Sequence, residues 1–367
     1  MPLTIGIDGS RLAVSEPTGT ETYTARIIRA IAELGAPDLL RVYLTGDSPP
    51  RAIDSSIDLR HIPFPRFWTH GRLSWEMLRR RPDVLFVPAH VIPLIHPRSV
   101  VTIHDLGFLH EPDSHPAHSQ LALDWSTRWS VRVARRIIAV SAATAQDLHR
   151  SYGVDPHKIR IVHHGVDPVI RTPPENAVNA VRTRLGLPDP FILSVGTVQP
   201  RKNYGRLAEA MGRVAAAGLP HRLVIAGKRG WLADRVESEI AASGSSGRVI
   251  QLGYVAAADL AVLYAAADLV CLPSLFEGFG LPLLEAMAHG VPTAASDRAA
   301  LPEVGGDATL RFDPLDIRQI GEALVRGLTD DDTRRRLSVA GPRRAAQFTW
   351  ERAARETLAV LHDVGSE

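Results

Sequence analysis

Residues 273–290 read Pro-Ser-Leu-Phe-Glu-Gly-Phe-Gly-Leu-Pro-Leu-Leu-Glu-Ala-Met-Ala-His-Gly, and this stretch carries the strongest structural signal in the chain. It follows Leu269–Leu272, a short apolar run typical of a buried strand. Pro282 suits the first position of a helix, and Gly290 suits the left-handed residue that ends one. The stretch therefore predicts a strand, a glycine-bearing loop and a helix in succession, which is the repeating unit of a parallel α/β sheet.

The loop of this unit has the composition of an anion site. Gly278 and Gly280 allow backbone amides to approach a ligand, and the positive helix end favours a phosphate or diphosphate. Glu277 precedes the glycines, and Glu285 is expected in the first helical turn. Carboxylates accept hydrogen bonds from paired sugar hydroxyls, so a diphosphate with a sugar on one side and a ribose on the other would suit both. The alternative is a loop carboxylate and a first-turn acid that complements the helix dipole.

Similar short apolar runs occur along the chain in two series, separated by the Pro-rich stretch Val166–Pro190. Helical patterns lie between them, so each series predicts a parallel sheet covered by helices. We therefore expect two doubly wound domains. Because ligands of open α/β sheets bind beyond the carboxyl ends of the strands, we expect the two domains to face an interdomain cleft. The expected strands are Leu3–Asp8, Leu40–Leu44, Val84–Val87, Ser99–Ile103 and Ile137–Val140, then Phe191–Val195, Arg222–Ala226, Val249–Leu252, Leu269–Leu272 and Thr293–Ala295.

Length and composition fit this architecture. The chain has 367 residues, enough for two domains, of which 45% are hydrophobic and 22% charged. A net charge of only +2 argues against a nucleic-acid partner. The single cysteine, Cys271, excludes an intrachain disulfide and a multi-cysteine zinc site. No apolar run approaches the ~20 residues of a membrane span, and Met1 leads into a strand-like run, not a signal peptide, so a cytoplasmic location is expected.

Two pairs of polar residues stand at predicted strand ends. Arg201 and Lys202 come after the strand Phe191–Val195, where they could hold a diphosphate and stabilise its departure, or form a solvated helix start. His104 and Asp105 end the strand Ser99–Ile103. His104 could hydrogen-bond a sugar or assist proton transfer, and Asp105 could orient it or the acceptor. The structural alternative for His104 is a buried ring bonded to a backbone carbonyl.

These motifs resemble those of the retaining glycosyltransferases with two Rossmann-like domains (the GT-B fold), and most closely the GT4 family. The Glu-x7-Glu element Glu277–Glu285 carries the resemblance, which extends over nearly the whole chain. One departure is His164, which stands where the family usually has Asn before Gly-Val-Asp. The other matching segments are Gly19–Tyr23, Val101–Leu106, Val140–Ser141, His163–Asp167, Ser194–Gly196, Arg201–Asn203, and Leu252–Val255 with Asp259.

The resemblance implies roles for the matching residues. Glu285 would accept both ribose hydroxyls, Glu277 would face the donor sugar, and Gly19 would let the N-terminal loop close over the phosphates. Tyr254 and Val255 would line the base pocket. The implied catalytic set is His104, Asp105, Glu277, Arg201 and Lys202. The implied donor-binding set is Gly19, Gly196, Arg201, Lys202, Tyr254, Val255, Glu277, Gly278, Phe279, Gly280, Leu281 and Glu285.

The resemblance also implies domain boundaries. An acceptor-side domain is expected over residues 1–167, a linker over 168–189 and a donor-binding domain over 190–345. Residues 346–367 would form a C-terminal helix, with Thr349 as its N-cap, that crosses back to the first domain.

The predicted activity is transfer of a sugar, with retention and without a metal or other cofactor, from a nucleotide-diphosphate donor to a glycan, lipid-linked or small-molecule acceptor. GDP-mannose is the best match, because residues 101–110 look most like bacterial mannosyltransferases of this family. UDP-glucose, UDP-N-acetylglucosamine and dTDP-rhamnose stay open, as do the acceptor and the oligomeric state. The alternatives are a nucleotide-sugar hydrolase or epimerase on the same fold and a non-catalytic sugar-nucleotide-binding protein.

Residues 66–81 combine arginines with aromatic side chains. In related enzymes this region meets the acceptor or the bilayer. A solvated face is the favoured interpretation, and peripheral contact with the inner face of the plasma membrane is the alternative. A similar helical pattern contains Trp125 and Trp129, for which core packing is expected. The residues of the first region are Arg66, Phe67, Trp68, Arg72, Trp75, Arg79, Arg80 and Arg81.

Overall fold

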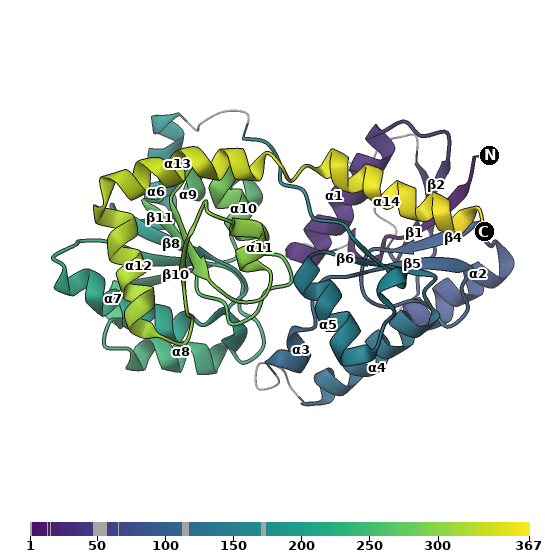
Figure 1. Cartoon of the computed structure of the whole chain (residues 1–367), viewed down its shortest axis with the longest axis horizontal. Helices are drawn as coiled ribbons and strands as arrows, with labels where there is room; N and C mark the ends of the chain where they lie inside the picture. The colour runs from purple at the N-terminus through teal and green to yellow at the C-terminus, as the bar shows by residue number, and fades with distance from the viewer. Residues whose placement is uncertain are drawn as a thin grey trace. The chain divides into compact units, whose positions relative to one another are not determined.

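The computed structural model describes residues 2–12, 14, 16–46, 57–64, 66–111, 117–169 and 174–367. The chain forms two compact units (Figure 1). The first unit contains Met1–Leu106, His118–Gly165 and Phe348–Glu367, and the second contains Gly107–Ala117 and Val166–Gln347. The chain therefore returns to its first unit through its last helix.

A seven-stranded parallel sheet forms the centre of the first unit, with the strand order β3-β2-β1-β4-β5-β6-β7. Its central strands are short, apolar and almost completely buried, as strands covered by helices on both faces must be. The bounds are β1 (Thr4–Asp8), β2 (Leu39–Leu44), β3 (Asp58–His61), β4 (Val84–Val87), β5 (Arg98–Ile103), β6 (Arg136–Ala139) and β7 (Ile159–Ile161).

Two helices from opposite ends of the sequence pack together in this unit. In Figure 1, α1 (Gly19–Glu33) lies beside α14 (Trp350–Gly365), and Ile27 and Leu361 belong to the same core. Thr349 is the N-cap of α14, since its hydroxyl accepts the Arg352 amide hydrogen at 3.1 Å. The other helices are α2 (Ser74–Arg79), α4 (Ala117–Val133) and α5 (Ala142–Tyr152), with a π-helical turn at Trp68–Leu73 and 3-10 turns at Ser10–Leu12 and Pro156–Lys158.

The second unit has a six-stranded parallel sheet with the order β10-β9-β8-β11-β12-β13. Its strands are β8 (Phe191–Val195), β9 (Arg222–Ala226), β10 (Val249–Gly253), β11 (Leu269–Leu272), β12 (Thr293–Ser296) and β13 (Leu310–Phe312). Its helices are α3 (Gly107–His110), α6 (Glu175–Leu185), α7 (Tyr204–Ala216), α8 (Ala233–Ala242), α9 (Ala257–Ala266), α10 (Leu281–Ala288), α11 (Leu301–Gly305), α12 (Ile317–Thr329) and α13 (Asp331–Ala345), with 3-10 turns at Pro200–Lys202 and Ser246–Arg248.

Both sheets share one doubly wound topology. In each, the first strand of the unit sits in the middle and the strand order reverses beside it, between β1 and β4 in one sheet and between β8 and β11 in the other. Ligands of such folds bind at this switch point, beyond the carboxyl ends of the strands. The two Rossmann-like units predicted from the sequence are confirmed.

Several details differ from the sequence predictions. The short strands β3, β7 and β13 were not predicted. The expected linker, residues 168–189, contains the helix α6, and its residues 170–173 lie outside the described residues. Trp125 is 57% exposed, so the prediction of core packing for it is wrong. In the parts of the chain that the structure describes, the helices are too short or too polar to cross a membrane.

Candidate active site

Three of the predicted donor-site residues of the second unit lie at its topological switch point. Arg201 and Lys202 occupy the 3-10 turn that follows β8, and Glu277 lies in the loop that follows β11. These two strands are hydrogen-bonded neighbours in the sheet. The fold therefore brings together side chains that are 75 and 76 positions apart in the sequence.

Glu277 is the centre of a buried ion cluster. Lys202 Nζ donates to Glu277 Oε1 at 2.5 Å, and Arg201 Nη1 donates to Glu277 Oε2 at 3.1 Å. Ser274 Oγ adds a hydrogen bond to Oε1 at 2.7 Å. The Glu277 and Lys202 side chains are 9% and 10% exposed. Burial alone would raise the pKa of Glu277, but the charges of Lys202 and Arg201 outweigh it and lower the pKa. Both carboxylate oxygens therefore carry negative charge and are occupied by donors.

Glycine is required at two positions around this cluster. Gly196, with φ +151°, lies against the lysine, and an added Cβ would stand 2.8 Å from Cε of Lys202 and 3.0 Å from its Nζ. Gly280, with φ +101°, precedes α10, and a Cβ there would lie 2.6 Å from Cδ2 of Leu301. A side chain at either site would move the lysine or the start of the helix.

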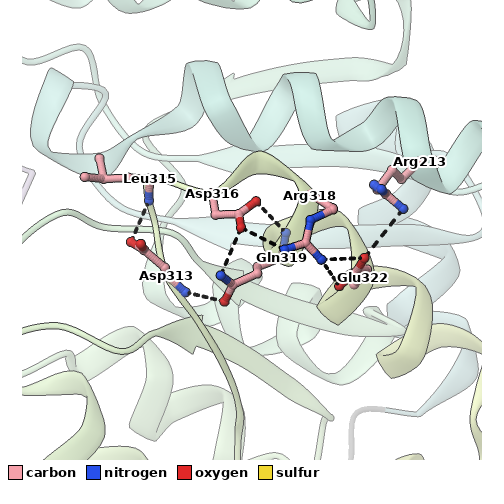
Figure 2. A network of polar contacts seen from close by, with 7 residues as sticks. All are labelled: Arg213, Asp313, Leu315, Asp316, Arg318, Gln319 and Glu322. Atoms are coloured by element: carbon pink, nitrogen blue, oxygen red, sulfur yellow. Dashed lines mark hydrogen bonds and ion pairs between the residues drawn. The ribbon is translucent and has the colours of Figure 1, made fainter.

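Asn203 fixes the turn that carries the two cations. Its Nδ2 donates to the carbonyls of Pro273 at 3.0 Å and Pro314 at 2.8 Å. Figure 2 shows the polar network around Pro314. Asp316 caps α12 by accepting the amide hydrogen of Gln319 at 3.1 Å, and Gln319 Oε1 accepts the amide hydrogen of Asp313. The cation turn is thus attached to two loops of the same unit.

Glu285 lies further along its helix than the sequence predicted. Because α10 begins at Leu281, Pro282 is the second helical residue, not the first, and Glu285 is past the first turn. The predicted left-handed stop at Gly290 is confirmed by its φ of +71°. Glu285 Oε2 accepts a hydrogen bond from the hydroxyl of Tyr264 at 2.8 Å.

The remaining predicted donor-site residues of this unit follow β11 and β10. Gly278 and Phe279 are buried in the loop between Glu277 and the helix, while Leu281 opens α10. Tyr254 follows β10 and is 38% exposed, and Val255 beside it is half-buried.

In the first unit, His104 follows β5 at the end of the sheet and is 8% exposed. Its Nε2 lies 2.8 Å from the carbonyl oxygen of Pro88. A carbonyl only accepts, so Nε2 must carry the proton and the neutral ring presents Nδ1 as an acceptor. Burial lowers the pKa of His104, although the bond to Pro88 opposes the shift. Asp105 is adjacent and its charge also favours the protonated ring.

His90 supports His104 and was not predicted. Its Nε2 accepts the backbone amide hydrogen of His104 at 3.0 Å, and the two rings stack with centroids 5.6 Å apart. Burial and the neighbouring His104 lower the pKa of His90 to about 4. His90 follows β4 as His104 follows β5, so the strand-end rule applied to Val84–Val87 could have found it.

His164, the departure from the family pattern, completes an aromatic cluster with His104. Its ring stacks on Tyr23 with centroids 4.5 Å apart, and Tyr23 meets the ring of His104 edge-on at 4.8 Å. Burial, with the neighbouring His104 and His163, lowers the pKa of His164 well below its usual value. This cluster therefore excludes positive charge.

Gly19 is the first residue of α1 and follows the N-cap Thr18, whose capping box includes Glu21. A Cβ at position 19 would meet nothing within 4 Å, so packing does not require glycine there. Within the described ranges, His, Cys, Asp and Glu side chains form no group of three or more that could hold a metal ion.

Comparisons with known proteins identify the family of this chain. Residues 17–169 match the family model of Glycosyltransferase Family 4, and residues 179–344 match that of Glycosyl transferases group 1. The chain is 31% identical to the O-antigen chain mannosyltransferase B of Escherichia coli over 290 residues, which cover 78% of this chain and 76% of that protein. It is 33% identical to the MMP alpha-(1->4)-mannosyltransferase of Mycolicibacterium hassiacum over 238 residues, covering 62% and 55%.

Solved structures show the same fold. Sucrose-phosphate synthase from Thermosynechococcus elongatus gives a TM-score of 0.76 at 21% identity, covering 99% of each chain. Anabaena Alr3699/HepE, solved in complex with UDP-glucose, gives 0.76 at 18% identity, covering 98% of this chain and 100% of that one. Fold and sequence matches together define a glycosyltransferase with two Rossmann-like units of the GT-B type.

The chain belongs to glycosyltransferase family 4, the group 1 glycosyl transferases. It is an enzyme of the retaining class that transfers a sugar from a nucleotide-activated donor.

Proposed function

We propose that the enzyme transfers mannose from GDP-mannose to a hydroxyl of a glycan or lipid-linked acceptor. The observation that carries the donor chemistry is the ion cluster of Arg201, Lys202 and Glu277 at the switch point of the second unit. The mannose assignment is supported by two relatives named as mannosyltransferases at 31% and 33% identity.

The cluster suits a diphosphate. Two cations against one carboxylate leave a net positive charge, to which the N-terminus of α10 adds about half a charge. Arg201 and Lys202 would bind the diphosphate together with the amides of Phe279, Gly280 and Leu281. A bound diphosphate would replace Glu277 as the counter-charge of the two cations. The Glu277 carboxylate would then turn towards the hydroxyls of the donor sugar.

The reaction is proposed as a same-face substitution. The bond from the anomeric carbon to the diphosphate oxygen breaks, and the acceptor oxygen bonds to that carbon from the same side. The proton of the acceptor hydroxyl passes to the departing phosphate oxygen. Lys202 and Arg201 stabilise the charge that accumulates on the leaving diphosphate. Through its Nδ1, His104 accepts a hydrogen bond from a hydroxyl of the sugar, and Asp105 orients the acceptor.

A ligand panel tests the donor. Melting temperatures are measured with ADP, GDP, UDP and dTDP, since a ligand that binds only the native state raises the melting temperature. We expect the largest shift with GDP. A shift with UDP and none with GDP contradicts the mannose assignment.

The hydrolase alternative is tested by following donor consumption with and without oligosaccharide and lipid-linked acceptors. Transfer should depend on the acceptor and give the same anomeric configuration in product and donor, as read by NMR. Sugar release at a rate that no acceptor changes supports hydrolysis instead.

We also propose that the first unit contacts the surface of an anionic membrane. Phe67, Trp75 and Leu78 are 81%, 52% and 60% exposed. Trp125 extends this apolar patch, because its ring lies 6.2 Å from that of His70 in the π-helical turn. The surrounding arginines, whose charge fits an anionic headgroup layer, are Arg66, Arg79, Arg80 and Arg81, all exposed.

Vesicle sedimentation tests this location. The enzyme should sediment with vesicles rich in phosphatidylglycerol and not with pure phosphatidylcholine, and the double variant Phe67→Ala/Trp75→Ala should lose most of this binding. Trp231→Ala is the matched control, because Trp231 is 47% exposed but lies in the second unit. Equal sedimentation of the double variant and its parent contradicts the proposal.

A further inference from the structure

Tyr264 is a buried polar residue that the reaction described above does not use. It lies in α9 and is 2% exposed, and α9 runs beside α10 in the second unit (Figure 1). Its hydroxyl donates to Oε2 of Glu285 in α10 at 2.8 Å. This bond joins the two helices next to the carboxylate that the proposed function assigns to the ribose.

The direction of this hydrogen bond is fixed. Burial raises the pKa of Tyr264 well above its usual value, and the charge of Glu285 raises it further. Tyr264 therefore stays protonated and always donates. A carboxylate has about four acceptor positions on its two oxygens, and the tyrosine occupies one of them.

The bond also orients the carboxylate. The terminal torsion of a glutamate is soft, so the plane of the carboxylate is set by whatever binds it. Glu285 is partly exposed. Tyr264 supplies a fixed, buried donor to one of its carboxylate oxygens.

A second residue holds Tyr264 in turn. The His289 ring stacks on that of Tyr264, with centroids 5.4 Å apart and planes at 29°. His289 Nδ1 lies 2.9 Å from the backbone carbonyl oxygen of Glu285, to which it must donate. The three residues therefore form a closed unit in which the backbone and the side chain of Glu285 are both restrained.

We propose that Tyr264 is a positioning residue for ribose recognition: its hydroxyl pre-orients Glu285 so that the carboxylate accepts both hydroxyls of a ribonucleotide. This inference rests on the ribose role of Glu285 in the proposed function. It adds that selection for ribose over deoxyribose depends on a residue that does not touch the nucleotide.

The test uses Tyr264→Phe, which removes one oxygen and keeps the ring. The KM for the donor should rise about threefold to tenfold, the factor expected when one side chain must be ordered on binding. The kcat should stay within about twofold, because the ribose is held alike in the ground state and the transition state. A merely structural role would not produce this separation of KM from kcat.

Calorimetric titration of the full-length enzyme identifies the contact. GDP, UDP and ADP are each compared with their 2′,3′-dideoxy forms. The variant should lose affinity for the ribonucleotide that the parent binds, by the same factor as the KM change, and lose none for its dideoxy form. Equal weakening of both forms, or of neither, overturns the proposal.

Two further variants complete the design. Tyr152→Phe is the matched control, since Tyr152 also donates to a carboxylate, Asp124 Oδ1 at 2.8 Å, but in the first unit; donor KM should not change. In a Glu285→Gln background, Tyr264→Phe should add little, because the two residues act as a unit. If Tyr264→Phe lowers ribonucleotide affinity in the Glu285→Gln background as much as it does in the parent, the proposal is also overturned.

Different results would contradict the proposed function and the role of Tyr264. If the parent binds no nucleoside diphosphate and transfers no sugar, the proposed function is wrong and this inference falls with it. If the parent binds ribonucleotides and Tyr264→Phe shows no ribose-dependent loss, only the inference is wrong.

Discussion

The two units place opposite kinds of polar chemistry at the ends of their central strands. In the first unit, His90, His104 and His164 have lowered pKa values and lie among aromatic rings. In the second, Lys202 and Glu277 are buried as charged groups in direct contact. One cluster is stable because its members stay neutral, and the other because its charges compensate each other.

This difference predicts different sensitivities. A neutral buried cluster is destabilised by any condition that adds charge, and acid is the simplest one. A compensated ion cluster tolerates moderate acid but not the loss of one member, because the remaining charges are then left uncompensated. Substitution and pH therefore separate the two units.

The largest effect is expected for Glu277→Gln, which keeps the size of the side chain and removes its charge. It leaves Arg201 and Lys202 without their counter-charge, and the free energy of unfolding should fall by about 4 kcal/mol. Urea unfolding followed by circular dichroism measures it. Asp58→Asn is the matched control, because Asp58 also lies between two arginines but is 26% exposed. A loss no greater than that of the control contradicts the buried-charge interpretation.

Lys202→Ala should mainly lower kcat, by ~3 kcal/mol or on the order of a hundredfold, because the lysine gains interaction energy as the diphosphate departs. Glu285→Ala should mainly raise the donor KM, because its contact is the same in both states. Steady-state kinetics with varied donor separates the two.

The control for the lysine is Lys158→Ala, whose ammonium donates to the carbonyls of Val131 and Arg132 in the first unit. Its kcat should match that of the parent. An unchanged kcat for Lys202→Ala would refute the role assigned to that residue.

Acid should weaken the first unit. The pKa of His90 is lowered from 6.5 to about 4 in the native state, so the unfolded chain binds protons first as the pH falls. Its contribution to stability is therefore complete above pH 6.5 and is lost towards pH 4. Between pH 7 and 5 the free energy of unfolding should fall by about 1–2 kcal/mol through this group. Tryptophan fluorescence reports it, because five of the six tryptophans lie in the first unit.

His90→Gln provides the comparison for the acid experiment. Glutamine can still accept the amide hydrogen of His104 but does not titrate, so the pH dependence should become shallower while stability at neutral pH changes little. An identical slope in the variant and the parent would exclude His90 as a source of the acid sensitivity.

The smallest effects on stability are expected at helix caps. Loss of a cap should destabilise both units to a similar extent. Thr349 caps α14 in the first unit, and Asp316 caps α12 in the second. Replacing either by Ala should lower the free energy of unfolding, for Thr349 by about 1 kcal/mol, measured as a shift in the urea midpoint. Arg235→Ala is the control, because its ion pair with Glu239 is solvent-exposed and should contribute less than a cap. Equal effects of all three contradict the capping argument.

The sequence predicted strands best where both faces are buried. The central strands of both sheets are mostly apolar and were all predicted, as was the edge strand β10. The missed strands β3, β7 and β13 lie at sheet edges and contain polar residues, as in Asp58–His61, so no apolar run marks them. These three strands are defined by the neighbours with which they pair, and those neighbours lie elsewhere in the sequence.

The same limit applies to the candidate site. Arg201, Lys202 and Glu277 were predicted because each belongs to a local motif, and the fold places them in contact. Tyr264 belongs to none of the motifs identified in the sequence, and its contact with Glu285 depends on how two helices pack. Such contacts are properties of packing, and a pattern in one sequence does not contain them.

Asn203 has a consequence for the order in which this protein is built. Its side chain bridges carbonyls that lie 70 and 111 positions further along the chain. Contacts of such long range form late in folding, because large loops must close first. During synthesis, the turn that carries the two cations would lack these anchors until the chain beyond Pro314 has emerged. The capacity to hold a diphosphate would therefore arise only with the nearly finished second unit, so that ligand binding would report completion of its sheet.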